Sequence, residues 1–343
     1  MNKVLIIGPS WIGDAVMAQT LFKIIKQRDS STIIHVLAPN WVIPILSFMP
    51  EVDRAIIWPF AHGEFNISKR YKFGKSLRKE HYTQAIVLPN SFKSALIPFW
   101  AKIPLRTGWH GEIRYGLLND IRILNKTKFP LMVQIFAALA FNKAESLPKQ
   151  LPLPQLIIKE NFNNEIDKKF HFSDFTQPIL ALCPGGEYGK SKRWSPEYFA
   201  EISKKKLNEG WLVWLLGGKN DKSIADEIEL LTQKKCTNFV GETTLDEAVV
   251  ILSKARIVIA NDTGLMHVAA ALQKPLVAIY GATSPKFAPP LSKNARIVTA
   301  NLKCSPCFKR SCPLKHNRYR CLTEIKPEMV LNTLDSLLAE LKS

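Results

Sequence analysis

The sequence predicts an α/β fold built from two doubly wound parallel sheets. Three observations support this prediction: short apolar runs alternate with helical patterns, glycine-containing loops follow several of these runs, and a proline-rich segment interrupts the alternation near the middle of the chain. Strands that alternate with helices are typical of a parallel sheet with both faces covered. A chain of 343 residues has room for two such domains.

In the first half, buried strands are expected over residues 4–7, 33–37, 55–58 and 85–88. A helix is expected over residues 14–27, because apolar residues between Met17 and Ile25 recur at helical spacing. The stretch "SLPKQLPLPQL" (146–156) carries three prolines and predicts a stiff, extended connection. We therefore expect domains at 1–150 and 151–343.

The alternation resumes in the second half, where strands are expected over residues 179–183, 211–215, 257–260 and 276–280. Helices are expected over residues 196–206, 221–233, 245–255, 265–272 and 327–342. No internal repeat aligns the two halves. Doubly wound sheets bind ligands at the carboxyl ends of their strands, so we expect a site in a cleft between two Rossmann-like domains.

The composition excludes several classes of protein. Hydrophobic residues make up 46% of the chain and charged residues 22%, which indicates a globular protein. No signal peptide and no apolar stretch of spanning length is visible, and six cysteines are too few for a disulfide scaffold, so we expect a cytoplasmic protein. The formal charge of +18 indicates an anionic partner, although a generally basic proteome would give the same surplus.

The first glycine loop lies in "IIGPSWIGDAV" (6–16) and has the G-x-x-x-x-G spacing of a phosphate-binding P-loop. Asp14 stands where a P-loop has its lysine, and a carboxylate there would repel phosphate. A dinucleotide dehydrogenase is disfavoured as well, because the loop is not G-x-G-x-x-G and no acidic residue ends the second strand. Asp14 is therefore either a helix N-cap or a group with chemistry of its own.

Two loops in the second half are suited to bind phosphate. In "NDTGLMHVAAAL" (261–272) a strand turns into a helix whose first N–H groups attract anions, and Gly264 allows a ligand to approach closely. In "PGGEYGKSKRW" (184–194) glycines precede three cations, and a further strand ends in the similar "LLGGKND". The alternatives are a plain helix cap, a packed His267 and a solvated basic loop. No D-x-D pair is present to hold a metal–diphosphate complex.

A cysteine-rich segment near the C-terminus has two interpretations. Cys304, Cys307, Cys312 and Cys321 have spacing compatible with a structural zinc site, with His316 as a spare ligand. The alternative is a reduced cluster that stabilises a loop. The same segment carries cations that suggest an anion-facing surface, namely Lys309, Arg310, Lys315, Arg318 and Arg320.

Three motifs in order, "GPSWIGDAVMAQTLF", "PGGEYGKSKRWSPEYF" and "NDTGLMHVAAAL", resemble those of the ADP-heptose lipopolysaccharide heptosyltransferases, which are inverting family 9 glycosyltransferases of GT-B fold. The resemblance covers nearly the whole chain, and "RTGWHGEIRYGLLND" (106–120) looks most like heptosyltransferase II. It implies an enzyme without cofactor or metal that moves heptose from ADP-heptose onto the first heptose of the lipopolysaccharide inner core, heptosyl-Kdo2-lipid A.

The resemblance also implies a role for individual residues. Asp14 would be the catalytic base that takes the proton of the attacking hydroxyl; ADP leaves well, so a single carboxylate suffices. Lys192 would contact the donor phosphates, with domain 151–343 binding ADP-heptose and domain 1–150 binding the acceptor. The other candidate substrate-binding residues are Gly13, Gly186, Lys190, Thr243, Asp262, Thr263, Gly264, Leu265 and His267.

Two positions depart from the family pattern. Thr243 falls where the family often has a methionine in the adenine pocket, and Lys219 stands where a related enzyme has a ribose-binding glutamate. Asp221 is the candidate that could replace that glutamate.

The implied acceptor lies at the cytoplasmic face of the inner membrane. Segment 67–82 would steer the enzyme to this anionic surface as a peripheral protein. Its cations are Lys69, Arg70, Lys72, Lys75, Arg78 and Lys79. The alternative is an ordinary solvated helix face. The family suggests a monomer.

Three other functions are compatible with parts of the sequence. Within the family, the rival is heptosyltransferase I or a relative with another acceptor. A GT-B epimerase would release free sugar. A nucleic-acid-binding protein would use the positive charge, but the lysines do not alternate with stacking aromatic residues, so no nucleic acid partner is expected.

Overall fold

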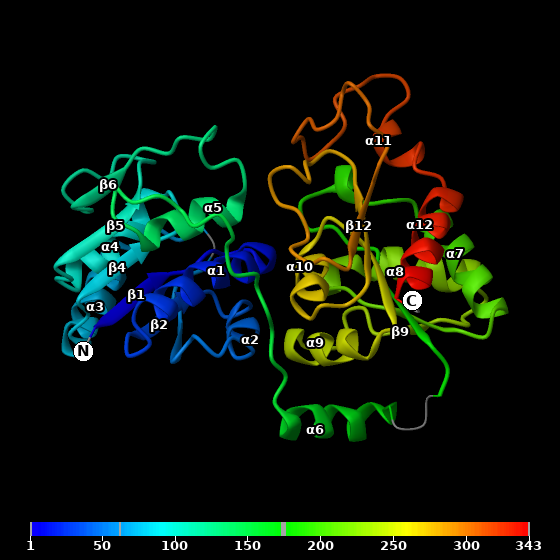
Figure 1. Ribbon diagram of the computed structural model, residues 1–343, viewed down its shortest axis with the longest axis horizontal. Coiled ribbons are helices and arrows are strands. Elements are labelled where there is room, and N and C mark those ends of the chain that lie inside the picture. The colour runs from blue at the N-terminus through cyan, green and yellow to red at the C-terminus, as the bar shows by residue number, and fades with distance from the viewer. Residues whose placement is uncertain (1, 62, 173–175, 342–343) are drawn as a thin grey trace. The chain divides into compact units, whose positions relative to one another are not determined.

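The computed structural model describes residues 2–61, 63–172 and 176–341. The chain divides into two compact units, Met1–Pro154 and Gln155–Ser343 (Figure 1). The division falls inside the proline-rich segment, at Pro154 rather than at residue 150.

The first unit is built on a six-stranded parallel sheet with strand order β3-β2-β1-β4-β5-β6. Its strands are β1 Lys3–Ile7, β2 Ile33–Ala38, β3 Arg54–Ile57, β4 Gln84–Val87, β5 Leu105–Trp109 and β6 Asp120–Arg122. The central strand β1 pairs with β2 and β4, so that Ile6 lies opposite Val36 on one side and Ile86 on the other. The sequence did not predict β5 and β6, because β5 contains Arg, Thr and Gly and β6 is only three residues long.

Helices cover both faces of this first sheet. They are α1 Ile12–Arg28, α2 Ile43–Leu46, α3 Ile67–Ser76, α4 Phe92–Trp100 and α5 Met132–Ala137. Helix α1 packs against α5, and α3 packs against α4. One buried cluster joins the strand residues Leu5 and Val87 to Ile97 of α4. Burial of these apolar side chains, at about 25 cal/mol per Å², holds the layers together.

The second unit carries another six-stranded parallel sheet, with order β12-β11-β10-β7-β8-β9. Its strands are β7 Ile179–Cys183, β8 Leu212–Leu215, β9 Thr237–Asn238, β10 Ile257–Asn261, β11 Leu276–Tyr280 and β12 Ala295–Thr299. The sequence pattern did not predict β9, which has two residues, or β12, which is partly exposed. Read from β9 to β12, the order repeats that of the first sheet.

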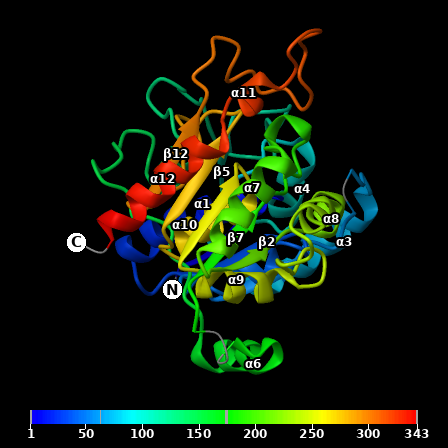
Figure 2. The same cartoon turned by 90° about the vertical axis from the view of Figure 1, so that its right-hand side faces the viewer.

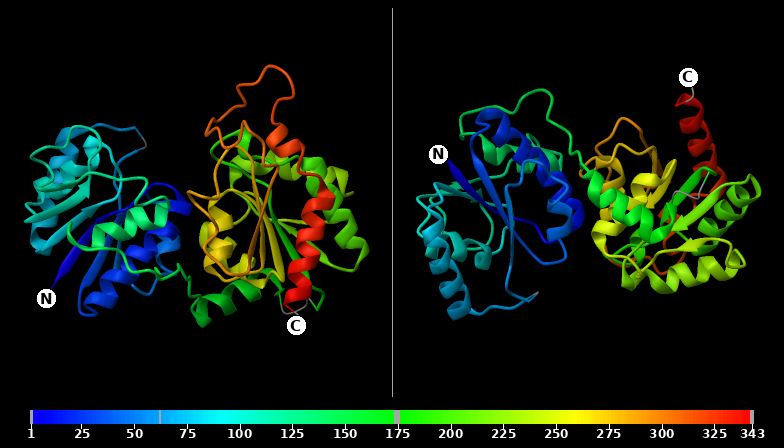
Figure 3. Two further views of the ribbon diagram at one scale, coloured as in Figure 1. Left: turned by 45° about the horizontal axis from the view of Figure 1, so that its top comes forward. Right: turned by 90° about the horizontal axis from the view of Figure 1, so that it is seen from below.

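The helices of the second unit are α6 Glu160–Phe170, α7 Pro196–Asn208, α8 Lys222–Leu231, α9 Leu245–Lys254, α10 Gly264–Ala271, α11 Arg320–Thr323 and α12 Pro327–Glu340. Helices α7, α8 and α12 cover one face of the sheet, and α9 and α10 cover the other (Figure 2). Helix α6 packs against α9 (Figure 3). The predicted end of the last helix, Lys342, lies outside the described residues.

In each unit the strand order reverses beside the first strand, between β1 and β4 and between β7 and β10. Such a switch point leaves a crevice at the carboxyl ends of the two central strands, where α/β proteins bind ligands. The loops that carry the predicted site residues emerge there.

None of the described helices is long and apolar enough to cross a membrane.

Candidate active site

Asp14 lies at the carboxyl edge of the first sheet, in the first turn of α1. The loop after β1 is held by Gly8, whose N–H donates to the carbonyl of Leu37 at 2.9 Å. The N-cap position of α1 belongs to Trp11, so Asp14 is not the N-cap that was considered as an alternative. Its side chain is half-buried, and the positive end of the helix dipole stabilises its negative charge. Gly13 is buried one position before it.

In the second unit, the buried Asp221 ties the glycine loops after β7 and β8 together. Its carboxylate accepts hydrogen bonds from the N–H of Gly186 at 3.2 Å and of Gly218 at 3.1 Å. A Cβ on Gly185 would stand 2.2 Å from this carboxylate, so only glycine fits there. Both carboxylate oxygens thus accept from the protein backbone, which gives Asp221 a structural role, and the ribose contact expected for it stays a prediction.

Asn261 links the loops on either side of the switch point. This fully buried side chain donates to the carbonyls of Pro184 at 2.7 Å and Gly185 at 3.1 Å. Its oxygen accepts from the N–H of Trp194 at 3.2 Å. The one signal of this bridge in the sequence is a polar residue at the end of an apolar strand.

Lys192 and Asp262 form an ion pair in the same crevice. The Lys192 Nζ lies 2.6 Å from Asp262 Oδ2, and the side chains retain only 16% and 8% of their exposure. The hydroxyl of Thr283 also donates to this carboxylate. Lys192, predicted to contact phosphate, is therefore held in place by Asp262, a residue that was predicted to bind the donor itself.

His267 lies buried on α10, close enough to interact electrostatically with Asp262 and Lys192. Burial lowers the pKa of His267 to about 4, with Asp262 opposing the shift and Lys192 adding to it. The imidazole is therefore neutral near pH 7. Like Asp262, it is a buried group beside Lys192.

The N-terminus of α10 faces the crevice with main-chain groups. Thr263 caps the helix, its hydroxyl accepting from the N–H of Met266 at 3.4 Å. The N–H groups of Gly264 and Leu265, in the first turn, have no intrahelical acceptor, and both residues are half-buried. Lys190 begins a short 3₁₀ helix, Lys190–Lys192, and is exposed. These groups are suited to hold an anion.

Thr243 lies further along the same sheet edge, after β9. Its hydroxyl donates to the carbonyl of Phe239 at 3.3 Å. Gly241, two residues earlier, donates from its N–H to the carbonyl of Gly217 at 3.1 Å, which joins this loop to the loop after β8. Among the described residues, Thr243 makes no hydrogen bond or ion pair with Lys192 or Asp262.

The cysteines remain thiols and do not form a metal site in the described part of the chain. No group of three or more His, Cys, Asp or Glu side chains there is arranged to hold a metal ion. Cys304, Cys307 and Cys312 nevertheless lie near Cys321. Burial raises the pKa of Cys321 to about 11, and the neighbouring thiols add to the shift.

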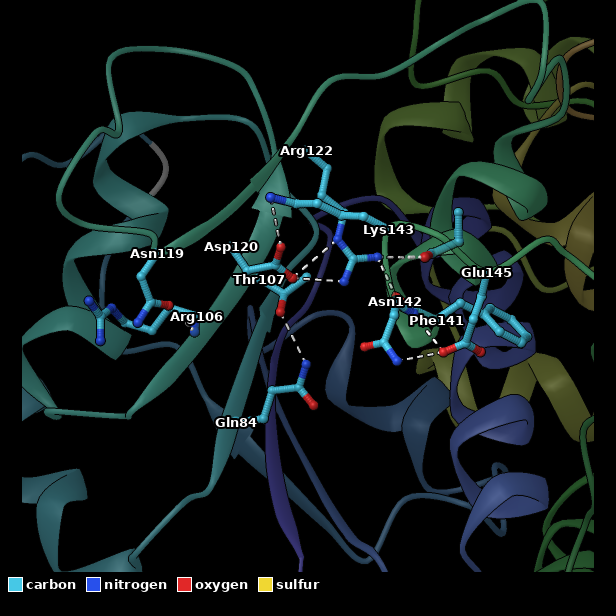
Figure 4. Close-up of polar contacts among 11 residues, drawn as sticks. Gln84, Arg106, Thr107, Asn119, Asp120, Arg122, Phe141, Asn142, Lys143 and Glu145 are labelled. Carbon is cyan, nitrogen blue, oxygen red and sulfur yellow. Dashed lines mark hydrogen bonds and ion pairs between the residues drawn. The ribbon is translucent and has the colours of Figure 1, made fainter.

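A cavity of about 880 Å³ in the first unit lies at the opposite edge of the sheet from Asp14. Its polar residues pair with one another: Asp120 lies 2.7 Å from Arg122 and 3.4 Å from Lys143 (Figure 4). Arg122 also donates to the carbonyls of Ala138 and Phe141. This network fixes the segment after α5 to the sheet, at the amino ends of the strands where a ligand is not expected.

Comparison with known proteins agrees with the fold and the three motifs. Residues 70–318 match the model of glycosyltransferase family 9 (heptosyltransferase). The lipopolysaccharide heptosyltransferase 2 enzymes of Salmonella typhimurium and Escherichia coli are each 45% identical, over 98% of this chain and 99% of their own. The structure of E. coli ADP-heptose lipopolysaccharide heptosyltransferase II is 42% identical and superimposes with a TM-score of 0.88 over 100% of both chains.

The protein is thus a glycosyltransferase of GT-B architecture. It belongs to glycosyltransferase family 9, the heptosyltransferases. The predictions of fold class, enzyme class and family are confirmed, and heptosyltransferase II is favoured over heptosyltransferase I. The roles of individual residues stay predictions.

One sequence prediction about the surface was wrong. Arg70, counted among the exposed cations of segment 67–82, is fully buried. Its guanidinium lies 4.1 Å from the ring centre of Phe60 and 5.1 Å from that of Trp58, and it donates to the carbonyl of Glu64 at 2.6 Å. Arg70 therefore anchors α3 to the core, because its position on the helix points inward.

Proposed function

We propose that this enzyme transfers heptose, with inversion, from ADP-heptose to the first heptose of the lipopolysaccharide inner core. The second unit would bind the donor and the first unit the acceptor. The observation that carries this proposal is the buried Lys192–Asp262 pair beside the N-terminus of α10, in a chain 45% identical over nearly its full length to heptosyltransferase 2 enzymes.

The donor site follows from the charges in the crevice. Lys192, Lys190 and the N–H groups of Gly264 and Leu265 offer positive groups to a diphosphate. Asp262 holds the Lys192 ammonium in one place, so the lysine side chain loses little conformational entropy when the donor binds. As the bond from the anomeric carbon to the diphosphate oxygen breaks, these groups stabilise the charge that develops on ADP.

The acceptor chemistry is assigned to Asp14. Its carboxylate would accept the proton of the attacking hydroxyl as that oxygen bonds to the anomeric carbon. ADP departs from the opposite side of the carbon, which inverts its configuration. The proton ends on Asp14 and the bonding electrons leave with ADP, so no second carboxylate is needed.

The first test measures ADP release from ADP-heptose by wild type and by Asp14→Asn, with and without heptosyl-Kdo2-lipid A and in the presence of EDTA. We expect acceptor-dependent release in the wild type that survives EDTA. The variant should lose about 10³-fold in kcat and still bind ADP. A fully active variant would remove Asp14 from the mechanism, and release of free heptose without acceptor would indicate hydrolysis or epimerase-type chemistry instead.

We further propose that the enzyme works as a monomer bound to the cytoplasmic face of the inner membrane through the α3–α4 face. This face is defined by the exposed apolar residues Phe65, Ile67, Tyr71 and Phe99 and the cations Lys69, Lys72, Lys75, Lys93 and Lys102. Tyr71 of α3 contacts the ring of Trp100 of α4, and Phe65, which precedes α3, contacts Phe92 at the start of α4. Aromatic rings beside lysines suit the interface of an anionic bilayer.

Sedimentation with vesicles of phosphatidylglycerol and phosphatidylethanolamine tests this surface. The double variant Lys72→Gln/Lys75→Gln should bind about 30-fold more weakly, because each of the two cations near an anionic surface contributes on the order of 1 kcal/mol. The matched control Lys234→Gln/Lys235→Gln removes two exposed lysines from the second unit and should bind like the wild type. Equal losses in both variants would mean that net charge alone drives binding.

A further inference from the structure

The cysteine-rich segment that follows β12 packs directly against the loop that carries Lys192. Ser191 donates from its N–H to the carbonyl of Arg310 at 3.3 Å, and from its hydroxyl to that of Lys309. The hydroxyl of Tyr188 donates to the carbonyl of Phe308 at 2.6 Å. These partners lie about 120 residues apart in sequence. In Figure 1 the segment is the orange loop between β12 and α11.

Gly189 shows how close this packing is. Its backbone has a φ of +146°, and a Cβ there would stand 2.6 Å from the Arg310 carbonyl oxygen. Any side chain would push the two segments apart, so the glycine is required by a partner far away in the chain.

The same segment is also fixed to the loop after β11. The N–H groups of Cys307 and Phe308 both donate to the carbonyl of Ala282, at 3.0 and 2.8 Å. Ala282 in turn donates to the carbonyl of Ser191 at 3.3 Å, and its neighbour Thr283 donates to Asp262. Residues 305–310 are thus held between two loops that surround the Lys192–Asp262 pair.

This packing brings a second cation to the ring that Lys192 contacts. The Lys192 Nζ lies 5.1 Å from the ring centre of Tyr188, and the Arg310 guanidinium lies 5.5 Å from the same centre. Lys192 is neutralised by Asp262, whereas within the described residues no carboxylate lies in ion-pair distance of Arg310 or of Lys190. Two unneutralised cations beside a paired one leave an excess of positive charge that a bound polyanion would offset.

We propose that Arg310 is a further donor-binding residue, which Tyr188 holds beside Lys192 so that both cations contact the diphosphate of ADP-heptose. The segment 305–310 is then a structural part of the donor site, because its carbonyl contacts with Tyr188 and Ser191 set the position of Arg310. This inference rests on the proposed function, since it assumes that the second unit binds the nucleotide donor.

The planar shape of the guanidinium group explains why Arg310 rather than Lys309 is assigned this role. A guanidinium presents several N–H donors in one plane and binds two phosphate oxygens at once while it stacks on an aromatic ring. Lys309 contributes a carbonyl to Ser191, and its exposed side chain makes no ring contact among the described residues.

The test compares Arg310→Gln with Arg318→Gln, measuring dissociation constants for ADP, AMP and adenosine by calorimetry and steady-state constants for ADP-heptose. Arg318 is the matched control, because it lies in the same cysteine-rich segment and its guanidinium lies at the same 5.5 Å from a ring centre, that of Tyr319, while among the described residues it makes no ring contact with Tyr188. We expect Arg310→Gln to weaken ADP about tenfold, AMP less and adenosine not at all, and to raise KM for ADP-heptose. Arg318→Gln should bind all three ligands as the wild type does.

Arg310→Lys keeps the positive charge but loses the planar set of N–H donors. It should therefore recover only part of the ADP affinity that Arg310→Gln loses. The proposal is overturned if Arg310→Gln binds ADP as tightly as the wild type, or if adenosine weakens as much as ADP, which would mean that the variant merely disturbs the loop. A wild-type protein that does not bind ADP would instead contradict the proposed function itself.

Discussion

The two units share one strand order but place opposite charges after their first strand. In the first unit, the loop after β1 leads to Asp14 in the first turn of α1. In the second unit, the loop after β7 leads to Lys192. The shared topology determines where a ligand can bind, and the charge at that point determines which chemical group of the ligand can bind there. A base and an anion site can therefore arise from the same architecture.

The two edges also differ in how firmly side chains hold them. In the second unit, Asn261 and Asp221 tie neighbouring loops together through buried hydrogen bonds. In the first unit, the N-cap Trp11 makes no side-chain cap bond, and the loops after β1 and β2 are joined by the half-exposed indole of Trp41, which donates to the carbonyl of Ser10 at 2.9 Å. The proposed diphosphate site would need fixed positive groups, and the buried ion pair of the second unit holds Lys192 in position before a ligand binds.

The largest effect is expected from breaking the buried ion pair. Lys192→Met should reduce affinity for ADP and destabilise the fold by about 3 kcal/mol, because it leaves the Asp262 carboxylate buried without its partner. The double variant Lys192→Met/Asp262→Asn should recover much of the stability in chemical denaturation but none of the transfer activity. Unchanged stability of the single variant would show that the pair is not a structural element.

A smaller loss is expected from Gly185→Ala. Its new Cβ would overlap the Asp221 carboxylate, and overpacking of this kind costs about 2 kcal/mol. Gly218→Ala is the matched control, since its Cβ would stand 4.0 Å from the same carboxylate. Thermal unfolding monitored by circular dichroism should separate the two variants, and equal melting temperatures would argue against the tight packing of this loop.

Acid should lower the free energy of unfolding of the second unit because of His267. Its pKa of about 4 in the folded protein is below the unfolded value near 6.5, so the unfolded chain binds more protons between these values and stability falls as pH decreases. From pH 7 to pH 5 this amounts to roughly 2 kcal/mol. Denaturation of His267→Gln over this range should show a flatter pH dependence, and an unaltered slope would assign the acid sensitivity to other groups.

The smallest effect is expected at the helix caps. Thr263→Ala removes the cap of α10 and Thr244→Ala removes that of α9, and each loss costs about 1 kcal/mol. Only Thr263→Ala should also weaken ADP binding, because its helix faces the crevice. Similar ADP affinities in the two variants, measured by calorimetry, would indicate that the N-terminus of α10 does not contact the donor.

Much of the fold was predictable because the signals are local. The runs at 4–7 and 276–280 are apolar throughout and become β1 and β11 with little change in their bounds. Strands β6 and β9 gave no such signal, since they have only three and two residues, of which Ile121 alone is apolar. The repeated strand order was equally invisible, because topology is preserved here without alignable residues.

The sequence by itself determined the α/β class, the glycine loops, the position of Asp14 at the start of a helix and the family. Only the tertiary structure decided that Asp262 pairs with Lys192 and that Arg70 points into the core. It also decided that the carbonyl of Arg310 meets Ser191. The physical reason is distance along the chain: periodicity and loop composition report interactions between near neighbours, whereas these contacts join segments that become adjacent only when the sheets and helices have packed.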